Sequence, residues 1–244
     1  GTNRRITAAA ASQSQTGSSF TRSGIDGRFT DAGTVDIGTS NNFTVNTLPL
    51  DYFKVEAVGG GDISTQMAWI PFAIRITAQD ASANTVTTFF GTVEINSNGD
   101  LSLGGGTTAA FSDGVLSFQS VAFSAGGTYS ITATKTGGSE AGTSNIFTVN
   151  NPVPTTTSIS PNIEMYGGAP FTMTINGTNF VPTSVVRYNG FDRPTTFVSS
   201  TRLTAGILGS DMTVMGFYPI TVFNPTPAGG TSNAQIFTVG VASK

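Results

Sequence analysis

Residues 143–150 read Thr-Ser-Asn-Ile-Phe-Thr-Val-Asn, and they join a polar turn to a short segment in which apolar and polar side chains alternate. Such alternation is typical of a β-strand with one buried face. Closely similar stretches occupy residues 39–46 and 231–240. The copies begin 104 residues apart (39 to 143) and 88 residues apart (143 to 231), and a β-sandwich domain takes about 100 residues. We therefore interpret each copy as the last strand of one domain.

This repeat divides the chain into three parts. Residues 1–46 form an N-terminal extended arm that ends in an orphan strand, residues 47–150 form a first β-sandwich, and residues 151–244 form a second. The two sandwiches meet at residues 151–154, Asn-Pro-Val-Pro, a short linker that proline stiffens. Alternating segments separated by Gly, Asn and Asp fill both domains, and no amphipathic helix is predicted. The sequence therefore predicts an all-β fold.

The composition fits an extracellular protein and excludes several classes of function. Only 10% of the residues are charged, against about 25% in an average globular protein. The net charge of -3 offers no basic field that would attract nucleic acid. No apolar run reaches the roughly 18 residues that a membrane-spanning helix needs. We expect a secreted, extracellular or cell-surface protein that has no membrane span and does not bind nucleic acid.

The first domain resembles a known family. Residues 72–80 (FAIRITAQD), 90–93 (FGTV) and 125–133 (AGGTYSITA) follow in order the pattern of bacterial immunoglobulin-like repeats in large surface proteins, and the resemblance covers residues 50–150. It implies an immunoglobulin-like β-sandwich. Trp69 stands where smaller residues are expected, so we expect a contact there that is peculiar to this protein.

The second domain resembles a different branch of the same fold. Residues 159–161 (ISP), 166–168 (YGG), 171–180 (FTMTINGTNF) and 218–222 (YPITV) follow the pattern of an IPT/TIG domain, and the resemblance covers residues 154–240. It implies a second immunoglobulin-like sandwich, but this fold hosts receptors, DNA-binding domains and passive spacers alike. Fold class is therefore predicted as tandem immunoglobulin-like β-sandwiches with an N-terminal extended arm.

Catalysis finds little support in the residues. The chain has no His and no Cys, so a Ser-His-Asp or Cys-His site and a thiolate metal site cannot form. A carboxylate pair for glycoside hydrolysis would have to come from Glu56, Glu94, Glu140 and Glu164, and Glu56 and Glu94 are expected to face solvent from the middle of strands. We predict that the protein is not an enzyme and holds no cofactor.

Turn and surface residues leave two further chemistries open. Asp80, Asp100 and Asp113 fall in predicted turns, where they could bind calcium or simply favour the turn geometry. Lys54 and Lys135 could form an isopeptide bond with an Asn, or could be ordinary solvated lysines. The sequence does not decide between these alternatives.

The N-terminal arm is locally basic on an acidic protein. We predict that it adds a strand to the sheet of a neighbouring copy, which would give a filament, sheath or layer. The alternatives are an arm that packs along its own domain, or a chain that is a piece of a longer adhesin. The residues predicted to serve polymerisation are Arg4, Arg5, Arg22, Arg28, Phe43 and Val45.

Aromatic residues provide a second candidate contact surface. Trp69, Tyr188 and Phe191 are expected to form an exposed patch that contacts a sugar or another subunit. The predicted function is that of a non-enzymatic structural subunit that forms a homo-oligomer or polymer. The alternatives are an adhesin or spacer module with a glycan or host-surface ligand, and an accessory region of a secreted polysaccharide-degrading enzyme.

Overall fold

The computed structural model describes residues 49–241 throughout and, before them, the backbone of five short strands. These strands are β1 (Arg4–Ile6), β2 (Ser19–Arg22), β3 (Arg28–Phe29), β4 (Val35–Ile37) and β5 (Phe43–Asn46).

Strand β5, expected to be an orphan, pairs antiparallel with β2 of the same chain, and β4 lies between β1 and β3. Donation of the arm to a neighbouring copy therefore stays a prediction. The side chains of its six predicted contact residues lie outside the described residues.

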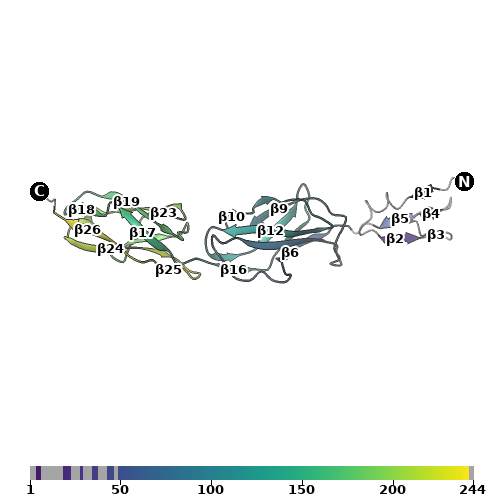
Figure 1. Ribbon diagram of the computed structural model, residues 1–244, viewed down its shortest axis with the longest axis horizontal. Coiled ribbons are helices and arrows are strands. Elements are labelled where there is room, and N and C mark those ends of the chain that lie inside the picture. The colour runs from purple at the N-terminus through teal and green to yellow at the C-terminus, as the bar shows by residue number, and fades with distance from the viewer. Residues whose placement is uncertain are drawn as a thin grey trace.

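The first sandwich contains two four-stranded sheets and one three-stranded group (Figure 1). The four-stranded sheet has the order β10-β12-β8-β6 and contains β6 (Tyr52–Ala57), β8 (Phe72–Gln79), β10 (Leu101–Leu103) and β12 (Val115–Phe123). A second sheet, of order β11-β9-β14-β15, contains β9 (Val93–Ser97), β11 (Gly106–Thr107), β14 (Ile131–Lys135) and β15 (Ala141–Thr143). The third group, of order β13-β16-β7, contains β7 (Gln66–Met67), β13 (Gly127–Tyr129) and β16 (Phe147–Asn150).

The second sandwich repeats this plan. One sheet has the order β17-β19-β23-β22 and contains β17 (Thr155–Ser160), β19 (Phe171–Thr178), β22 (Thr195–Ser199) and β23 (Arg202–Ile207). The other has the order β18-β26-β24-β20-β21, with β25 beside β24, and contains β18 (Ile163–Met165), β20 (Val185–Tyr188), β21 (Phe191–Arg193), β24 (Gly216–Asn224), β25 (Gly230–Thr231) and β26 (Gln235–Gly240). A 3₁₀ turn, η1 (Gly209–Met212), precedes β24, and the described residues contain no α-helix.

Strand order identifies both sandwiches as immunoglobulin-like. In each, a central antiparallel pair, β8 with β12 or β19 with β23, is flanked by the first strand on one side and a short strand on the other. After its first strand, each chain segment crosses to the opposite sheet, and there a second short strand pairs parallel with the last strand of the sandwich. These pairs are β7 with β16 and β18 with β26. This is the two-sheet arrangement of the immunoglobulin constant-type domain. The predicted fold class is therefore confirmed.

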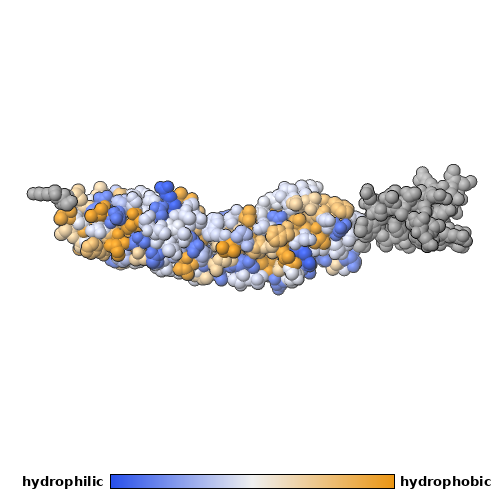
Figure 2. All heavy atoms as spheres, viewed as in Figure 1, coloured by the Kyte–Doolittle hydropathy of each residue, from blue (hydrophilic) through white to orange (hydrophobic). Residues whose placement is uncertain are grey.

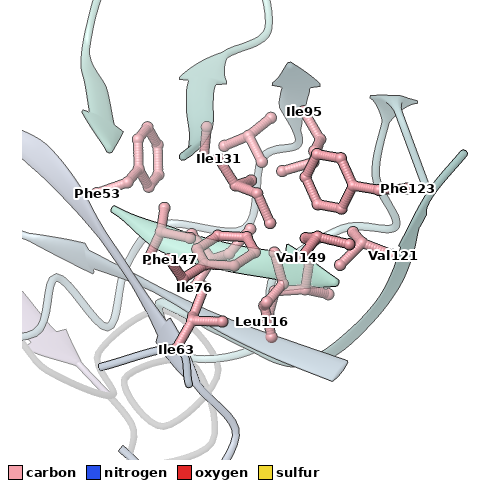
Figure 3. Close-up of a cluster of buried hydrophobic side chains, with 14 of the residues drawn as sticks. Phe53, Ile63, Ile76, Ile95, Leu116, Val121, Phe123, Ile131, Phe147 and Val149 are labelled. Atoms are coloured by element: carbon pink, nitrogen blue, oxygen red, sulfur yellow. The ribbon is translucent and has the colours of Figure 1, made fainter. Parts of the chain in front are cut away.

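The repeated Phe-Thr-Val segments fill the two cores. Phe147 and Val149 point inward from β16, and Phe237 and Val239 do the same from β26 (Figure 3 shows the first pair). Full burial of such a side chain stabilises a fold by about 1.5–3 kcal/mol, so the period-two pattern directs each final strand to its core. The intervening Thr residues are only half-buried, as the alternation predicts.

The Ser-Asn pair before each final strand is a backbone clamp. In the first sandwich, the Ser144 hydroxyl accepts a hydrogen bond from Ile131 N at 3.0 Å. The Asn145 amide brackets Ile63, because Oδ1 accepts from Ile63 N at 2.7 Å and Nδ2 donates to Ile63 O at 3.0 Å. One side chain thereby satisfies both backbone groups of a buried residue in the connection between β6 and β7.

The second sandwich uses the same clamp. The Ser232 hydroxyl accepts from Val222 N at 2.9 Å, and the Asn233 amide brackets Thr156 N and Thr156 O at 2.9 and 2.8 Å. The repeat therefore has a physical reason, because in each sandwich the Ser hydroxyl binds a strand, β14 or β24, and the Asn amide brackets one residue from the first part of the domain.

Candidate functional site

Trp69 connects the two sandwiches. It follows β7 in a turn at the end of the first sandwich, with a left-handed φ of 66° that is uncommon for a bulky residue. The turn is held by Trp69 N, which donates to Phe123 O at 2.8 Å. Indole Nε1 donates to Phe180 O of the second sandwich at 2.9 Å, and the indole ring stacks on Phe197 with centroids 6.3 Å apart and planes 12° apart. The turn thus presents the indole to the neighbouring domain.

The cores of the sandwiches meet beside this contact. Val181 belongs to the second sandwich, yet it is fully buried within the core cluster of the first. Val181 N donates to the Ser184 hydroxyl at 2.8 Å, which fixes the loop after β19 that carries it. Apolar burial therefore continues across the boundary between the domains.

Asn151, the first linker residue, binds both sandwiches. Its Oδ1 accepts from Gly126 N of the first sandwich at 2.6 Å, and its Nδ2 donates to Pro225 O of the second at 2.8 Å. Its backbone donates to Pro227 O at 2.8 Å and accepts from Gly229 N at 2.9 Å. A Cβ on Gly126 would lie 2.8 Å from Asn151, so this approach requires glycine.

Asn224 and Asn179 bind the rest of the linker from within the second sandwich. The fully buried Asn224 amide donates to Pro152 O at 2.9 Å and to Asn179 O at 2.7 Å, and its Oδ1 accepts from the Ser184 hydroxyl at 2.6 Å. Asn179 Nδ2 in turn donates to Val153 O at 3.0 Å. The linker carbonyls are therefore engaged by side chains of the second sandwich. We call the contacts of Trp69, Val181, Asn151 and Asn224 the joint.

The three aromatic residues predicted to form one exposed patch lie in three different environments, so that prediction is wrong. Trp69 is half-buried in the joint, and Phe191 is exposed. Tyr188 is buried, because it lies opposite Ile220 on the inward face of the sheet.

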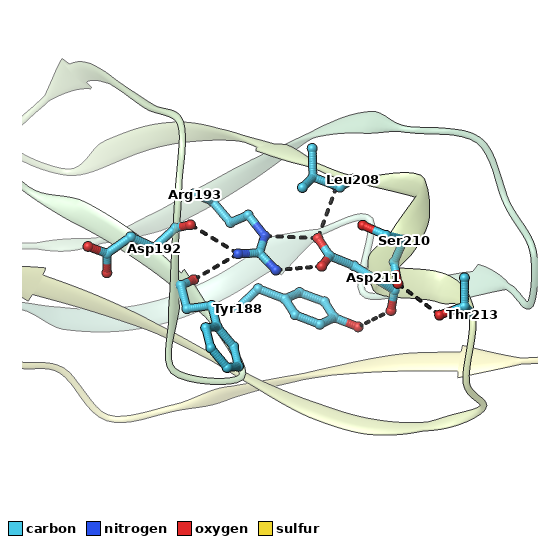
Figure 4. Close-up of polar contacts among 8 residues, drawn as sticks. Tyr188, Asp192, Arg193, Leu208, Ser210, Asp211 and Thr213 are labelled. Carbon is cyan, nitrogen blue, oxygen red and sulfur yellow. Dashed lines mark hydrogen bonds and ion pairs between the residues drawn. The ribbon is translucent and has the colours of Figure 1, made fainter.

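Tyr188 belongs to a polar cluster that secures η1 (Figure 4). Its hydroxyl donates to Asp211 O at 2.9 Å, and Asp211 forms a nearly buried ion pair with Arg193. Burial, with the nearby Tyr218 and the Asp211 carboxylate, raises the pKa of the Tyr188 phenol, which stays protonated as a donor. The Asp211 carboxylate also accepts from Leu208 N at 3.0 Å, so the cluster closes the turn.

Glu56 is buried, contrary to the expectation that it faces solvent. Its carboxylate lies 2.7 Å from Lys54 Nζ, pairs with Arg75, and accepts from Gly61 N at 3.2 Å. Burial raises the pKa of Glu56, but the hydrogen bonds of Lys54, Arg75 and Gly61 outweigh that effect and hold it below its usual value. A hollow of about 430 Å³ lies beside it. A carboxylate kept ionised in this way cannot act as a general acid at neutral pH.

Asp80 and the two lysine candidates have structural partners. Asp80 Oδ1 accepts from Ser82 N at 2.9 Å and from Asn84 N at 2.8 Å, so it organises its own turn. Lys54 pairs with Glu56, and Lys135 pairs with Glu140 at 2.7 Å. In the part of the chain that the structure describes, no three His, Cys, Asp or Glu residues gather where a metal ion could be held. Within the same residues, no helix has the length and apolar character needed to cross a bilayer.

Comparisons with known proteins return fold-level likenesses alone. No protein-family model matches the chain, and no curated protein matches it. The D0-D1 domain of intimin covers 78% of this chain and 99% of its own, with 11% identity and a TM-score of 0.31. Invasin, a bacterial integrin-binding protein, gives 13% identity and a TM-score of 0.40, with 78% of this chain and 39% of its own covered. The Yersinia pseudotuberculosis adhesin InvE gives 15% identity and a TM-score of 0.44, with 78% of this chain and 58% of its own covered.

At these similarities the class of the protein rests on its own strand order and on the joint. They define a tandem pair of immunoglobulin-like β-sandwiches connected through a built contact.

Proposed function

We propose that this chain is a non-enzymatic structural module of an extracellular or cell-surface protein, in which two immunoglobulin-like sandwiches form one stiff segment. The contact of Trp69 with Phe180 and Phe197 is the observation that carries the proposal. Domains within a chain move relative to each other by default unless their interface is extensive. Here an aromatic anchor, a core residue shared between the sandwiches and the bridging Asn151 all oppose that motion.

Stiffness of this kind suits a spacer that holds a binding surface at a fixed distance. A hydrogen bond and a stacked aromatic pair each contribute about 0.5–1.5 kcal/mol, and the buried Asn151 amide would lose its bond from Gly126 N if the joint opened. Opening therefore has a free-energy cost several times thermal energy. This supports the spacer or adhesin module over a loosely tethered accessory region of an enzyme.

The domain limits and the finer family assignment belong to the same proposal. Two separate core clusters support sandwiches at residues 47–150 and 151–244. The resemblance of residues 154–240 to an IPT/TIG domain rests on its sequence motifs. Polymerisation through strand addition by the arm, residues 1–46, and binding of a glycan or host-surface ligand remain further parts of the proposal.

Small-angle X-ray scattering of the whole chain tests the stiff segment. We expect the pair-distance distribution of the native protein to match one fixed arrangement of residues 49–241. The double variant Trp69→Ala, Asn151→Ala should need an ensemble of arrangements, while Phe118→Ala, which removes an exposed aromatic of the first sandwich, should behave as the native chain. A native chain that already needs an ensemble would refute the proposal.

A further inference from the structure

The turn that carries Trp69 occurs a second time, at the far end of the second sandwich. There Gly167 takes the place of Trp69, with φ of 72° against 66°. Each turn follows a short strand that pairs parallel with the last strand of its sandwich. Trp69 N donates to Phe123 O at 2.8 Å, and Gly167 N donates to Met212 O at 2.9 Å, so one turn is anchored to the end of β12 and the other to η1, which follows the corresponding strand β23.

The closing hydrogen bonds of the two turns also correspond. Ile70 N donates to Met67 O at 3.2 Å in the first sandwich, and Gly168 N donates to Met165 O at 3.0 Å in the second. The end of the second sandwich is thus built like the end of the first, which docks a neighbouring immunoglobulin-like domain in the joint.

This second end is apolar and, among the described residues, exposed. Its large apolar side chains are between 55% and 73% exposed: Met165, Tyr166, Val214, Met215 and Val241. Figure 2 shows apolar residues gathered over the C-terminal end of the second sandwich. Contiguous exposed apolar surface of this kind marks sites of protein contact.

The other half of such a contact lies on the same molecule. In the joint, the loop after β19 supplies Phe180 and Val181 to the end of the first sandwich. The matching loop of the first sandwich, between β8 and β9, exposes Phe90 at 57%. The chain therefore carries a loop with an exposed aromatic side chain and an apolar turn end, the two kinds of surface that meet in the joint.

We propose that the turn end of the second sandwich, around Met165 and Tyr166, docks the loop end of the first sandwich of a second copy, around Phe90. The contact is heterologous, so it leaves one free end on each molecule and extends head to tail without closing. Because Gly167 supplies no indole, this contact is weaker than the joint and depends on protein concentration. It goes beyond the stiff-segment proposal, because a stiff segment need not associate.

Sedimentation velocity of the whole chain tests the proposal. The native protein should show a weight-average mass that rises with concentration. The variant Met165→Ser, Tyr166→Ser and the variant Phe90→Ser should each remain monomeric, and an equimolar mixture of the two should form dimers and nothing larger, because only one competent contact remains. Phe118→Ser, which removes an aromatic side chain that is somewhat more exposed than Phe90 or Tyr166, should associate like the native chain.

The thermal unfolding of each variant is measured as well. A variant that unfolds at the native temperature has kept its fold, so any loss of association then reflects loss of the contact. A native chain that stays monomeric at every concentration would overturn the proposal. Variants that still assemble alone would overturn it too, since association would then come from another surface, such as the arm. An equimolar mixture of the two variants that stays monomeric would also overturn the proposal. None of these results bears on the stiffness of the joint, which is measured within one molecule.

Discussion

Trp69 Nε1 donates a hydrogen bond to Phe180 O across 111 positions of sequence, from the end of one sandwich to the loop after β19 of the next. The indole has one polar group and a large apolar face, and the joint uses both, since the ring also stacks on Phe197. Because Trp69 is the single tryptophan of the chain, its optical properties report the joint directly.

Removal of the stacking partner should be visible in tryptophan fluorescence. We expect Phe197→Ala to shift the emission of Trp69 to longer wavelength and to increase quenching by acrylamide, because water reaches the uncovered indole face. Phe118→Ala, in the same sandwich as Trp69 but exposed and remote from the joint, should leave both quantities unchanged. Equal spectra for Phe197→Ala and the native chain would mean that the ring is not covered in solution.

Loss of the Asn151 side chain should destabilise the protein by about 1–3 kcal/mol, because the half-buried groups Gly126 N and Pro225 O would lose their partner. Equilibrium urea unfolding of Asn151→Ala measures this free energy. Asn96→Ala, at an exposed position of β9, is the matched control and should change it by no more than about 0.5 kcal/mol. An equal effect of the two substitutions would show that the bridging amide carries no stability.

The Ser-Asn clamps make a prediction for each sandwich separately. Asn145→Ala should lower the stability of the first sandwich and Asn233→Ala that of the second, each by about 1–3 kcal/mol, because each leaves a bracketed backbone pair unsatisfied. Native-state hydrogen exchange resolves the two, since amides of the affected core should exchange faster. Uniform acceleration in both cores from either variant would contradict separate clamps.

Glu56 should make stability fall in acid. Its pKa is lowered in the folded protein, so it contributes stability at pH above its unfolded pKa of about 4.3, and that contribution is lost as the pH falls through the folded value. Glu56→Gln should be less stable than the native chain at pH 7 by about 1–3 kcal/mol, and the difference should shrink toward pH 3. Urea unfolding across this pH range measures it, and a difference independent of pH would exclude the ionised carboxylate as its source.

The sequence predicted the sandwiches because their cores depend on local alternation. Phe147 and Val149 are two positions apart on one strand, so period alone assigns them to one face. The joint depends instead on segments that are distant in sequence. The large side chain of Trp69 indicated an unusual contact. Its partner, Phe180 O, is a backbone atom, and the type of side chain at a position does not show what its backbone atoms will bind.

Two errors have a common physical origin. Tyr188 and Glu56 both carry a polar group, and both were expected at the surface. Each is buried because its polar atoms find partners inside, the Asp211 carbonyl for Tyr188 and two cations for Glu56. Such partners come from neighbouring strands or from distant turns, and a single alternating segment cannot reveal them.

The stiff joint is tested most directly by a distance measured between the two sandwiches. The chain has no cysteine, so Ser117→Cys and Thr172→Cys, at exposed strand positions of the first and second sandwich, provide unique sites for two spin labels. Double electron–electron resonance on this doubly labelled chain should give one narrow distance distribution, which broadens when Trp69→Ala is added. A broad distribution in the chain that retains Trp69 would contradict a fixed joint.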